Sequence, residues 1–193
     1  MFGQTRVDGG PYRCAPRPEP ASEHMIPNGH DDPSTTVTRT KAVAIVTGGS
    51  AGTGRDVALG VAGWGWAIVV VYLADQRRAE ATVAEIFAAG GRTVSVRADL
   101  ADDLDVERLF AESISAFGRV DVVVHTTNGS ASHLYQHAAR HVREAGAIVS
   151  VTPAERISPG IARLVRERGI TVGRAPPGAV LSFLDTWRRR AIG

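Results

Sequence analysis

Two patterns of apolar and polar residues alternate along most of the chain. Short, nearly uncharged runs rich in Val, Ile and Ala alternate with longer segments in which apolar residues recur every three to four positions. The first pattern is typical of strands buried on both faces, and the second is typical of amphipathic helices. The predicted strands are 43–47, 67–73, 93–97, 120–124, 147–151 and 170–172. The predicted helices are one ending near 62, then 77–89, 102–117, 132–144, 159–168 and 180–190.

This regular alternation predicts an α/β fold of the Rossmann type. We expect a single doubly wound parallel sheet of about six strands with helices on both faces. The 193 residues, 44% of them hydrophobic, suffice for one domain with a sizeable core. Residues 1–40 contain six of the ten prolines and few large apolar side chains, so we predict a disordered tail there and a dinucleotide-binding domain over 41–193.

The stretch from Val43 to Gly54, V-A-I-V-T-G-G-S-A-G-T-G, joins the first predicted strand to the first helix. Glycine permits positive φ and a close approach of backbone to ligand. The start of a helix offers free N–H groups and the positive end of a dipole, which suit a pyrophosphate. The pattern therefore favours a phosphate-binding loop, and the alternative is an ordinary strand–helix turn without a ligand.

The spacing T-G-x-x-x-G-x-G from Thr47 resembles the short-chain dehydrogenase/reductase family. The resemblance continues through Ala98-Asp99-Leu100, Gly118-Arg119-Val120-Asp121, Gly169-Ile170-Thr171-Val172 and Pro177-Gly178, and covers about residues 41–180. It implies the strand order 3-2-1-4-5-6 and a nicotinamide dinucleotide bound at the carboxyl ends of the strands. The positions that it implies for cofactor binding are Thr47, Gly48, Ser50, Gly52, Thr53, Gly54, Asp99, Leu100, Pro177 and Gly178.

The end of the second strand bears on the choice between NAD and NADP. An acidic residue there would bind the ribose 2′-hydroxyl of NAD, but Tyr72 and Leu73 are uncharged. Arg77 and Arg78 follow, and arginine pairs well with phosphate, so we favour NADP with NAD as the alternative. Ala51 weakens this preference, since NADP-using relatives often carry a basic residue at that position. Both arginines also fit a solvated first helical turn.

The family's hydride transfer uses a Tyr-x-x-x-Lys pair, a serine and an asparagine as acid and positioning groups. The only lysine here is Lys41, before the first strand, and Tyr135 is followed four positions later by Ala139. Thr152 stands one position before the serine site. Standard oxidoreductase activity is therefore doubtful. The alternative is a non-catalytic relative that binds a nucleotide or a partner in a regulatory or structural role.

Histidines supply the remaining candidates for chemistry. His125, at the carboxyl end of the fourth strand, is a weak candidate for the catalytic acid, as is Thr152. The alternative is that His125 only fills the space that the asparagine occupies in the family. His133, His137 and His141 recur every four residues, a spacing that can bind zinc. No acidic or cysteine ligand accompanies them in the sequence, so we predict a packing face and no metal site.

The charge and the cysteine content limit which partners and which cellular compartment are expected. The net charge of +2 gives no general case for nucleic acid, although residues 130–193 hold ten arginines against four acids. That imbalance fits a solvated basic face, or an acidic or phosphate-bearing partner.

The single Cys14 fits a reducing, cytoplasmic compartment. The uncharged run 57–74 fits a helix end and a buried strand better than a membrane span. A homo-oligomer or a protein partner is left open.

Overall fold

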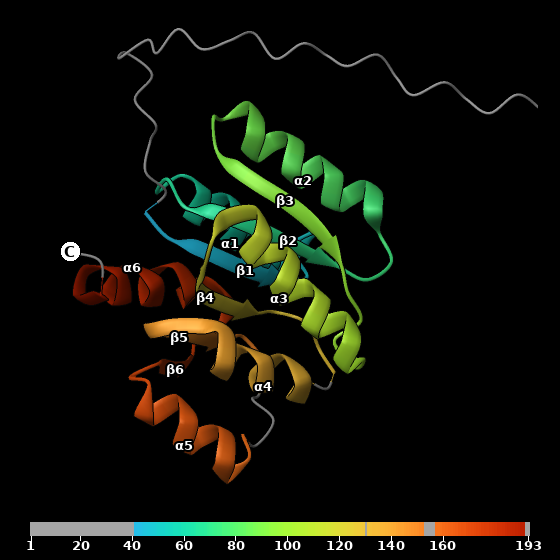
Figure 1. Cartoon of the computed structure of the whole chain (residues 1–193). Helices are drawn as coiled ribbons and strands as arrows, with labels where there is room; N and C mark the ends of the chain where they lie inside the picture. The colour runs from blue at the N-terminus through green and yellow to red at the C-terminus, as the bar shows by residue number, and fades with distance from the viewer. Residues whose placement is uncertain (1–40, 130, 153–156, 192–193) are drawn as a thin grey trace, which may run out of the picture. The chain divides into compact units, whose positions relative to one another are not determined.

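The computed structural model describes residues 41–129, 131–152 and 157–191, so the predicted tail lies outside the described residues. The six predicted strands and six predicted helices are all present (Figure 1). The strands are β1 (Val43–Thr47), β2 (Ala67–Tyr72), β3 (Arg92–Arg97), β4 (Val120–His125), β5 (Val142–Ser150) and β6 (Thr171–Arg174). The helices are α1 (Gly52–Ala62), α2 (Gln76–Ala88), α3 (Asp103–Phe117), α4 (Ser132–His141), α5 (Pro159–Glu167) and α6 (Val180–Ala191), with a 3₁₀ turn, η1 (Pro177–Ala179), before α6.

The six strands form one parallel sheet in the order β3-β2-β1-β4-β5-β6. This confirms the doubly wound fold and the strand order that the sequence predicts. The order reverses between β1 and β4, where Val46 pairs with Val70 of β2 on one side and with Val124 of β4 on the other. The carboxyl ends at this reversal form the crevice in which such sheets bind ligands.

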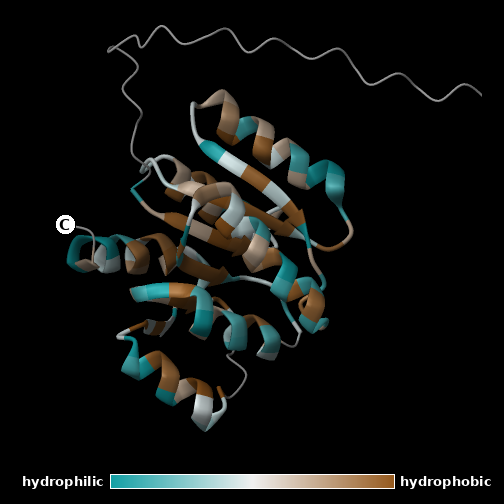
Figure 2. Ribbon diagram, viewed as in Figure 1, coloured by the Kyte–Doolittle hydropathy of each residue, from teal (hydrophilic) through white to brown (hydrophobic). Residues whose placement is uncertain are grey.

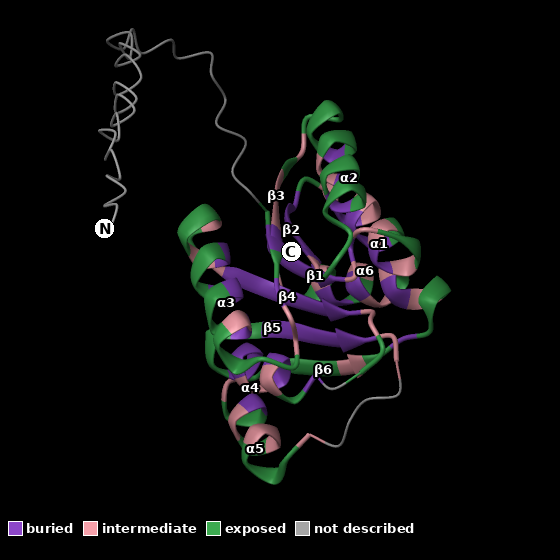
Figure 3. Ribbon diagram, turned by 90° about the vertical axis from the view of Figure 1, so that its right-hand side faces the viewer, coloured by how far each residue is buried: buried purple, intermediate pink, exposed green. Residues whose placement is uncertain are grey.

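Helices cover both faces of the sheet and enclose two separate cores (Figure 3). The helices α1, α2 and α6 pack on one face, with side chains such as Val57, Ile86 and Leu184. The helices α3, α4 and α5 pack on the other, with side chains such as Phe110 and Leu134. The apolar strands lie between the two layers and the polar helical faces point outward (Figure 2). Such burial of the strands on both faces explains their continuous apolar runs.

The connection between α4 and β5 differs from the sequence prediction. The helix predicted to Glu144 ends at His141, and β5 begins at Val142, five residues before the predicted strand. Val142 is buried and pairs with Val120, after which the register shifts before Val122 meets Ala147. The apolar stripe of the helix includes Val142, so periodicity alone extended the helix too far. Pairing with β4 overrides that local pattern.

Candidate functional site

The glycine-rich turn after β1 is fastened to the end of β4. Thr47 is fully buried, and its Oγ1 accepts a hydrogen bond from the backbone N–H of Thr126 at 3.0 Å. In return, Oγ1 of Thr126 donates to the carbonyl oxygen of Thr47 at 2.6 Å. Gly48 has φ +62°, and a Cβ there would lie within 3 Å of both Thr126 and Thr127. Only glycine fits this tight contact.

The amino end of α1 is open. Its N-cap, Ala51, offers no side-chain hydrogen bond, and the first turn of the helix carries no acidic residue. A Cβ built on Gly52 would meet nothing within 4 Å. Within the described residues, the backbone N–H groups of Gly52, Thr53 and Gly54 have no acceptor. Free backbone N–H groups at the start of a helix are what a pyrophosphate needs.

A pocket of about 350 Å³ extends from this turn toward β2 and β3. Its walls come from three connections that follow parallel strands: the turn after β1, the segment after β2 and the segment after β3. Thr127, Asn128 and Gly129, which follow β4, also line it. The predicted residues in the lining are Thr47, Gly48, Ser50, Asp99 and Leu100. The fold therefore brings part of the predicted glycine-rich loop and the Asp99-Leu100 pair to one pocket, whereas Gly52, Thr53, Gly54 and Arg77 are not in its lining.

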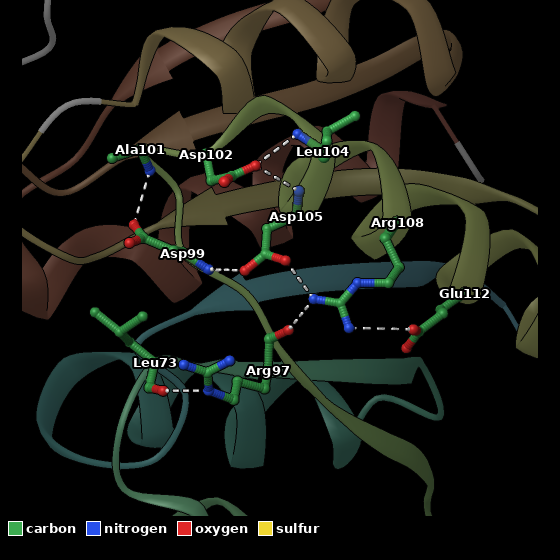
Figure 4. A network of polar contacts seen from close by, with 9 residues as sticks. All are labelled: Leu73, Arg97, Asp99, Ala101, Asp102, Leu104, Asp105, Arg108 and Glu112. Carbon is green, nitrogen blue, oxygen red and sulfur yellow. Dashed lines mark hydrogen bonds and ion pairs between the residues drawn. The ribbon is translucent and has the colours of Figure 1, made fainter.

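The wall after β3 is held by a network of acidic side chains (Figure 4). The N–H of Asp99 donates to Oδ2 of Asp105 at 2.9 Å, and the carboxylate of Asp99 accepts from the N–H of Ala101 at 2.9 Å. Asp102 caps α3 by accepting from the N–H groups of Leu104 and Asp105. The hydrogen bond from the Asp99 backbone, followed by that from Arg108, lowers the pKa of Asp105. These hydrogen bonds fix the shape of the wall.

Arg97 is a residue of the pocket region that the sequence did not single out. Its Nε donates to the carbonyl oxygen of Leu73 at 3.1 Å, and its own carbonyl oxygen accepts from Nη2 of Arg108 at 3.1 Å. Figure 4 shows its guanidinium beside Leu73, with the remaining nitrogens directed into the space between Leu73 and Asp99. Both of those residues line the pocket. The last position of an edge strand carries no motif, so only the pairing of β2 with β3 reveals this arginine.

The two arginines predicted after β2 differ in their surroundings. Arg78 forms an ion pair with Asp75, with 3.1 Å between Nε and Oδ2, and its backbone N–H is capped by the same carboxylate. Arg77 is exposed beside Asp75 and Glu80 and has no hydrogen-bond or ion-pair partner among the described residues. The charge of Arg77 is therefore freer for a ligand than that of Arg78.

The remaining predicted residues lie outside this pocket. His125 is 2% exposed, with Nδ1 3.2 Å from Oγ1 of Thr47 and its ring edge-on to Tyr135. Thr152 is half-buried, and its carbonyl oxygen accepts from the hydroxyl of Ser150 at 2.9 Å. Pro177 and Gly178 form the exposed start of η1. The buried position of His125 supports its interpretation as packing filler.

The three histidines of α4 have an acidic neighbour that the sequence did not reveal. Oδ1 of Asp103, at the start of α3, lies 3.1 Å from Nδ1 of His133 and 3.0 Å from Nε2 of His137. His137 also stacks on His141 and on Phe110. Asp103 is thus an acidic neighbour that the fold brings to the histidines from another helix. No group of three metal-binding side chains is arranged to hold an ion within residues 41–129, 131–152 and 157–191.

No helix in the described part of the chain combines the length and the apolar character needed to cross a membrane. The run 57–74 divides into the end of α1, a turn, and β2, as its pattern predicts.

Comparison with known proteins identifies the family. The family model described as short chain dehydrogenase matches residues 42–145, which is more than half of the chain. The chain therefore belongs to the short chain dehydrogenase family.

Individual relatives agree with this assignment. A 3-oxoacyl-[acyl-carrier-protein] reductase of Synechocystis sp. is 41% identical over 85 residues, which are 44% of this chain and 34% of that protein. The chain thus spans about a third of the length of this curated relative. A short chain dehydrogenase of Burkholderia cenocepacia, solved in complex with NADP, has a TM-score of 0.59 and 28% identity over 72% of this chain and 74% of its own. A short-chain dehydrogenase/reductase of Serratia marcescens has a TM-score of 0.61 and 26% identity, over 72% of this chain and 74% of its own.

Proposed function

We propose that this chain binds NADP(H) in the pocket at the carboxyl ends of β1, β2 and β3. The observation that carries the proposal is the open, uncapped start of α1 beside a pocket walled by Asp99 and Leu100. The pyrophosphate fits at the N–H groups of Gly52 to Gly54, and the adenosine fits between Leu73 and Leu100. The Burkholderia relative, which was solved with NADP, supports this type of ligand.

The preference for NADP(H) over NAD(H) rests on charge. Leu73 and Ala74 carry no acid at the end of β2, where a carboxylate would favour NAD. Arg97 contacts Leu73 from β3, Arg77 stands in the first turn of α2, and Arg78 is engaged by Asp75. Guanidinium groups bind phosphate strongly, so we assign the 2′-phosphate to Arg77 and Arg97.

We propose that carbonyl reduction by the family's usual route is absent or very slow. The cofactor would supply the hydride, but a proton donor beside the substrate is also required. A phenol has a free pKa of about 10 and needs a neighbouring cation to act as an acid near neutral pH. Tyr135 is buried against His125, and the only lysine precedes β1. Binding without efficient chemistry also fits the alternative of a regulatory or structural nucleotide-binding relative.

Calorimetric titration of the full chain with NADPH and with NADH tests the binding proposal. We expect saturable binding of NADPH. Arg97→Ala and Arg77→Ala should each weaken NADPH binding by about 10- to 100-fold, since a hydrogen bond to a charged group is worth about 1.5–3 kcal/mol, and leave NADH within twofold. Arg78→Ala is the matched control and should change the affinity ratio less. Absence of binding for both cofactors would exclude the proposed function.

Turnover of a panel of aldehydes and ketones, followed by the absorbance of NADPH, tests the proposal on activity. A rate of about 10 per second, the median for ordinary enzymes, would show that the chain carries a proton donor of another kind. His125→Ala and Thr152→Ala would then identify it.

A further inference from the structure

Two walls of the proposed cofactor pocket lead directly into helices that pack on each other. Residues 98–101 line the pocket and precede α3, which begins at Asp103; they form the β3–α3 wall. Residues 127–129 also line it and precede α4, which begins at Ser132; they form the β4–α4 wall. The helices α3 and α4 lie side by side on one face of the sheet (Figure 3). A contact between their first turns therefore holds the two walls relative to each other.

Asp103 makes such a contact. Its Oδ1 lies 3.0 Å from Nε2 of His137 and 3.1 Å from Nδ1 of His133, which is one helical turn earlier on α4. The side chain of Asp103 is 55% exposed, whereas that of His137 is 7% exposed. The rings of Phe110 and His141 stack on His137, with centroids 6.1 and 5.9 Å away. The carboxylate of α3 therefore binds a histidine whose position on α4 is fixed by packing.

The carboxylate of Asp103 is ionised in the neutral range. Of the causes that lower the pKa of Asp103, the hydrogen bond with His137 is the largest, followed by the charges of His137 and His133. The negative charge also stands at the start of α3, where the helix dipole favours it. Histidine side chains change their charge between about pH 5 and 8, and a charged ring binds a carboxylate more strongly than a neutral ring does. The attraction between Asp103 and α4 therefore increases as pH falls from 8 to 6.

Other charged and titratable groups lie on the elements around α4. They are Glu107 of α3, Arg140 and His141 of α4, Arg168 after α5, His125 of β4 and Arg143 of β5. Arg143 pairs with Asp121, and Arg168 donates to backbone carbonyl oxygens in the last turn of α4. Burial, followed by the charge of His137, lowers the pKa of His141, so this ring is uncharged at pH 7. It therefore adds no repulsion there to a charge on its neighbour.

We infer that Asp103 is a positioning residue of the proposed cofactor pocket, which through His133 and His137 holds the β3–α3 and β4–α4 walls together more firmly as pH falls from 8 to 6. This hold is a property of the free chain and needs no cofactor. Its consequence, which rests on the proposed function, is that the contact adds more to the affinity for NADPH at pH 6 than at pH 8.

Amide hydrogen exchange of the free, full chain, measured on residues 98–106 and 131–138, tests the hold on the walls. Asp103→Asn keeps an oxygen that can accept from a neutral histidine but removes the charge. We expect it to raise exchange in both segments about twofold to fivefold at pH 6, as for a partly exposed ion pair, and less than about 1.5-fold at pH 8. Glu107→Gln removes a carboxylate from the next turn of α3 and is the matched control, which should exchange as the wild type does.

The comparison of the two pH values separates the contact from a general effect of charge on α3. Loss of a negative charge from the first turn of a helix acts through the helix dipole at both pH values and is confined to that turn. Exchange in Asp103→Asn that equals the wild type at pH 6, or that rises equally at pH 6 and 8, would overturn the inference.

Calorimetric titration with NADPH at pH 6 and 8 tests the consequence for binding. The dissociation constant of Asp103→Asn should exceed that of the wild type about twofold to fivefold at pH 6 and equal it at pH 8, and this ratio cancels the titration of the cofactor's own phosphate. The double variant His133→Gln, His137→Gln keeps N–H donors but cannot gain a proton. It should match the wild type at pH 8 and bind as weakly as Asp103→Asn at pH 6.

The two measurements distinguish failure of this inference from failure of the proposed function. Altered exchange at pH 6 with unchanged NADPH affinity would overturn the positioning role of Asp103. If the wild type binds neither NADPH nor NADH, the proposed function fails, and the exchange measurement alone decides whether Asp103 holds the walls.

Discussion

The contact between Gly54 and the turn after β1 makes the proposed phosphate-binding site sensitive to a single methyl group. A Cβ on Gly54 would lie 2.3 Å from the carbonyl oxygen of Gly48 and 2.8 Å from Oγ1 of Thr126. Neither atom can rotate away, because the first belongs to the backbone and the second is hydrogen-bonded to the carbonyl oxygen of Thr47. Ordinary contacts begin near 3.4 Å, so Gly54→Ala must move the start of α1 away from the turn by about 1 Å.

The expected cost of this displacement has two parts. Overpacking of a close contact destabilises a fold by about 1–3 kcal/mol. Movement of the helix start also misplaces N–H groups that would bind the pyrophosphate, and each hydrogen bond to a charged group is worth about 1.5–3 kcal/mol. We therefore expect Gly54→Ala to lower the free energy of unfolding by about 1–3 kcal/mol and to weaken NADPH binding at least about tenfold.

Urea unfolding and calorimetric titration with NADPH measure the two effects separately. Gly63→Ala, at the other end of α1, is the control: a Cβ there would lie 3.3 Å from its nearest neighbour at φ −60°, so binding should be unchanged. A Cβ at Gly52 meets no neighbour within 4 Å, so Gly52→Ala does not push the turn and the helix apart. This change should weaken NADPH binding, and its only cost in stability is the backbone strain at φ +52°. A folded Gly54→Ala protein that binds NADPH within twofold of wild type would refute the assignment of the site.

Three further predictions concern stability. Asp121→Asn should lower the free energy of unfolding by about 3 kcal/mol in urea titrations, because it removes a fully buried charge that pairs with Arg119 and Arg143. Ala145→Gly should raise the free energy of unfolding by about 1 kcal/mol, because Ala145 holds a positive φ of +57° that favours glycine. An unchanged or lower midpoint of thermal unfolding would contradict this prediction. Burial lowers the pKa of His141, so protonation favours the unfolded chain, and wild type should lose more stability than His141→Gln as pH falls below about 6.5. Identical pH profiles would count against this last effect.

Much of the architecture follows from local sequence pattern. The two periodicities of the chain placed each strand and helix, and the resemblance that begins at Thr47 implied the strand order found in the sheet. The strands and helices are accessible because burial on one face or on two imposes a repeat that a short window of sequence contains. The strand order came from the family resemblance alone. The pocket residues Thr47, Gly48 and Asp99 were expected from the resemblance to the short-chain dehydrogenase/reductase family.

Only the tertiary structure decided which side chains meet across long separations in sequence. It placed Arg97 on the carbonyl oxygen of Leu73 and Asp103 beside two histidines of α4. It also shortened α4, because Val142 is paired into the sheet with Val120. None of these contacts has a local period. Each depends on the register of neighbouring strands and on how closely two elements pack, which are properties of the assembled sheet.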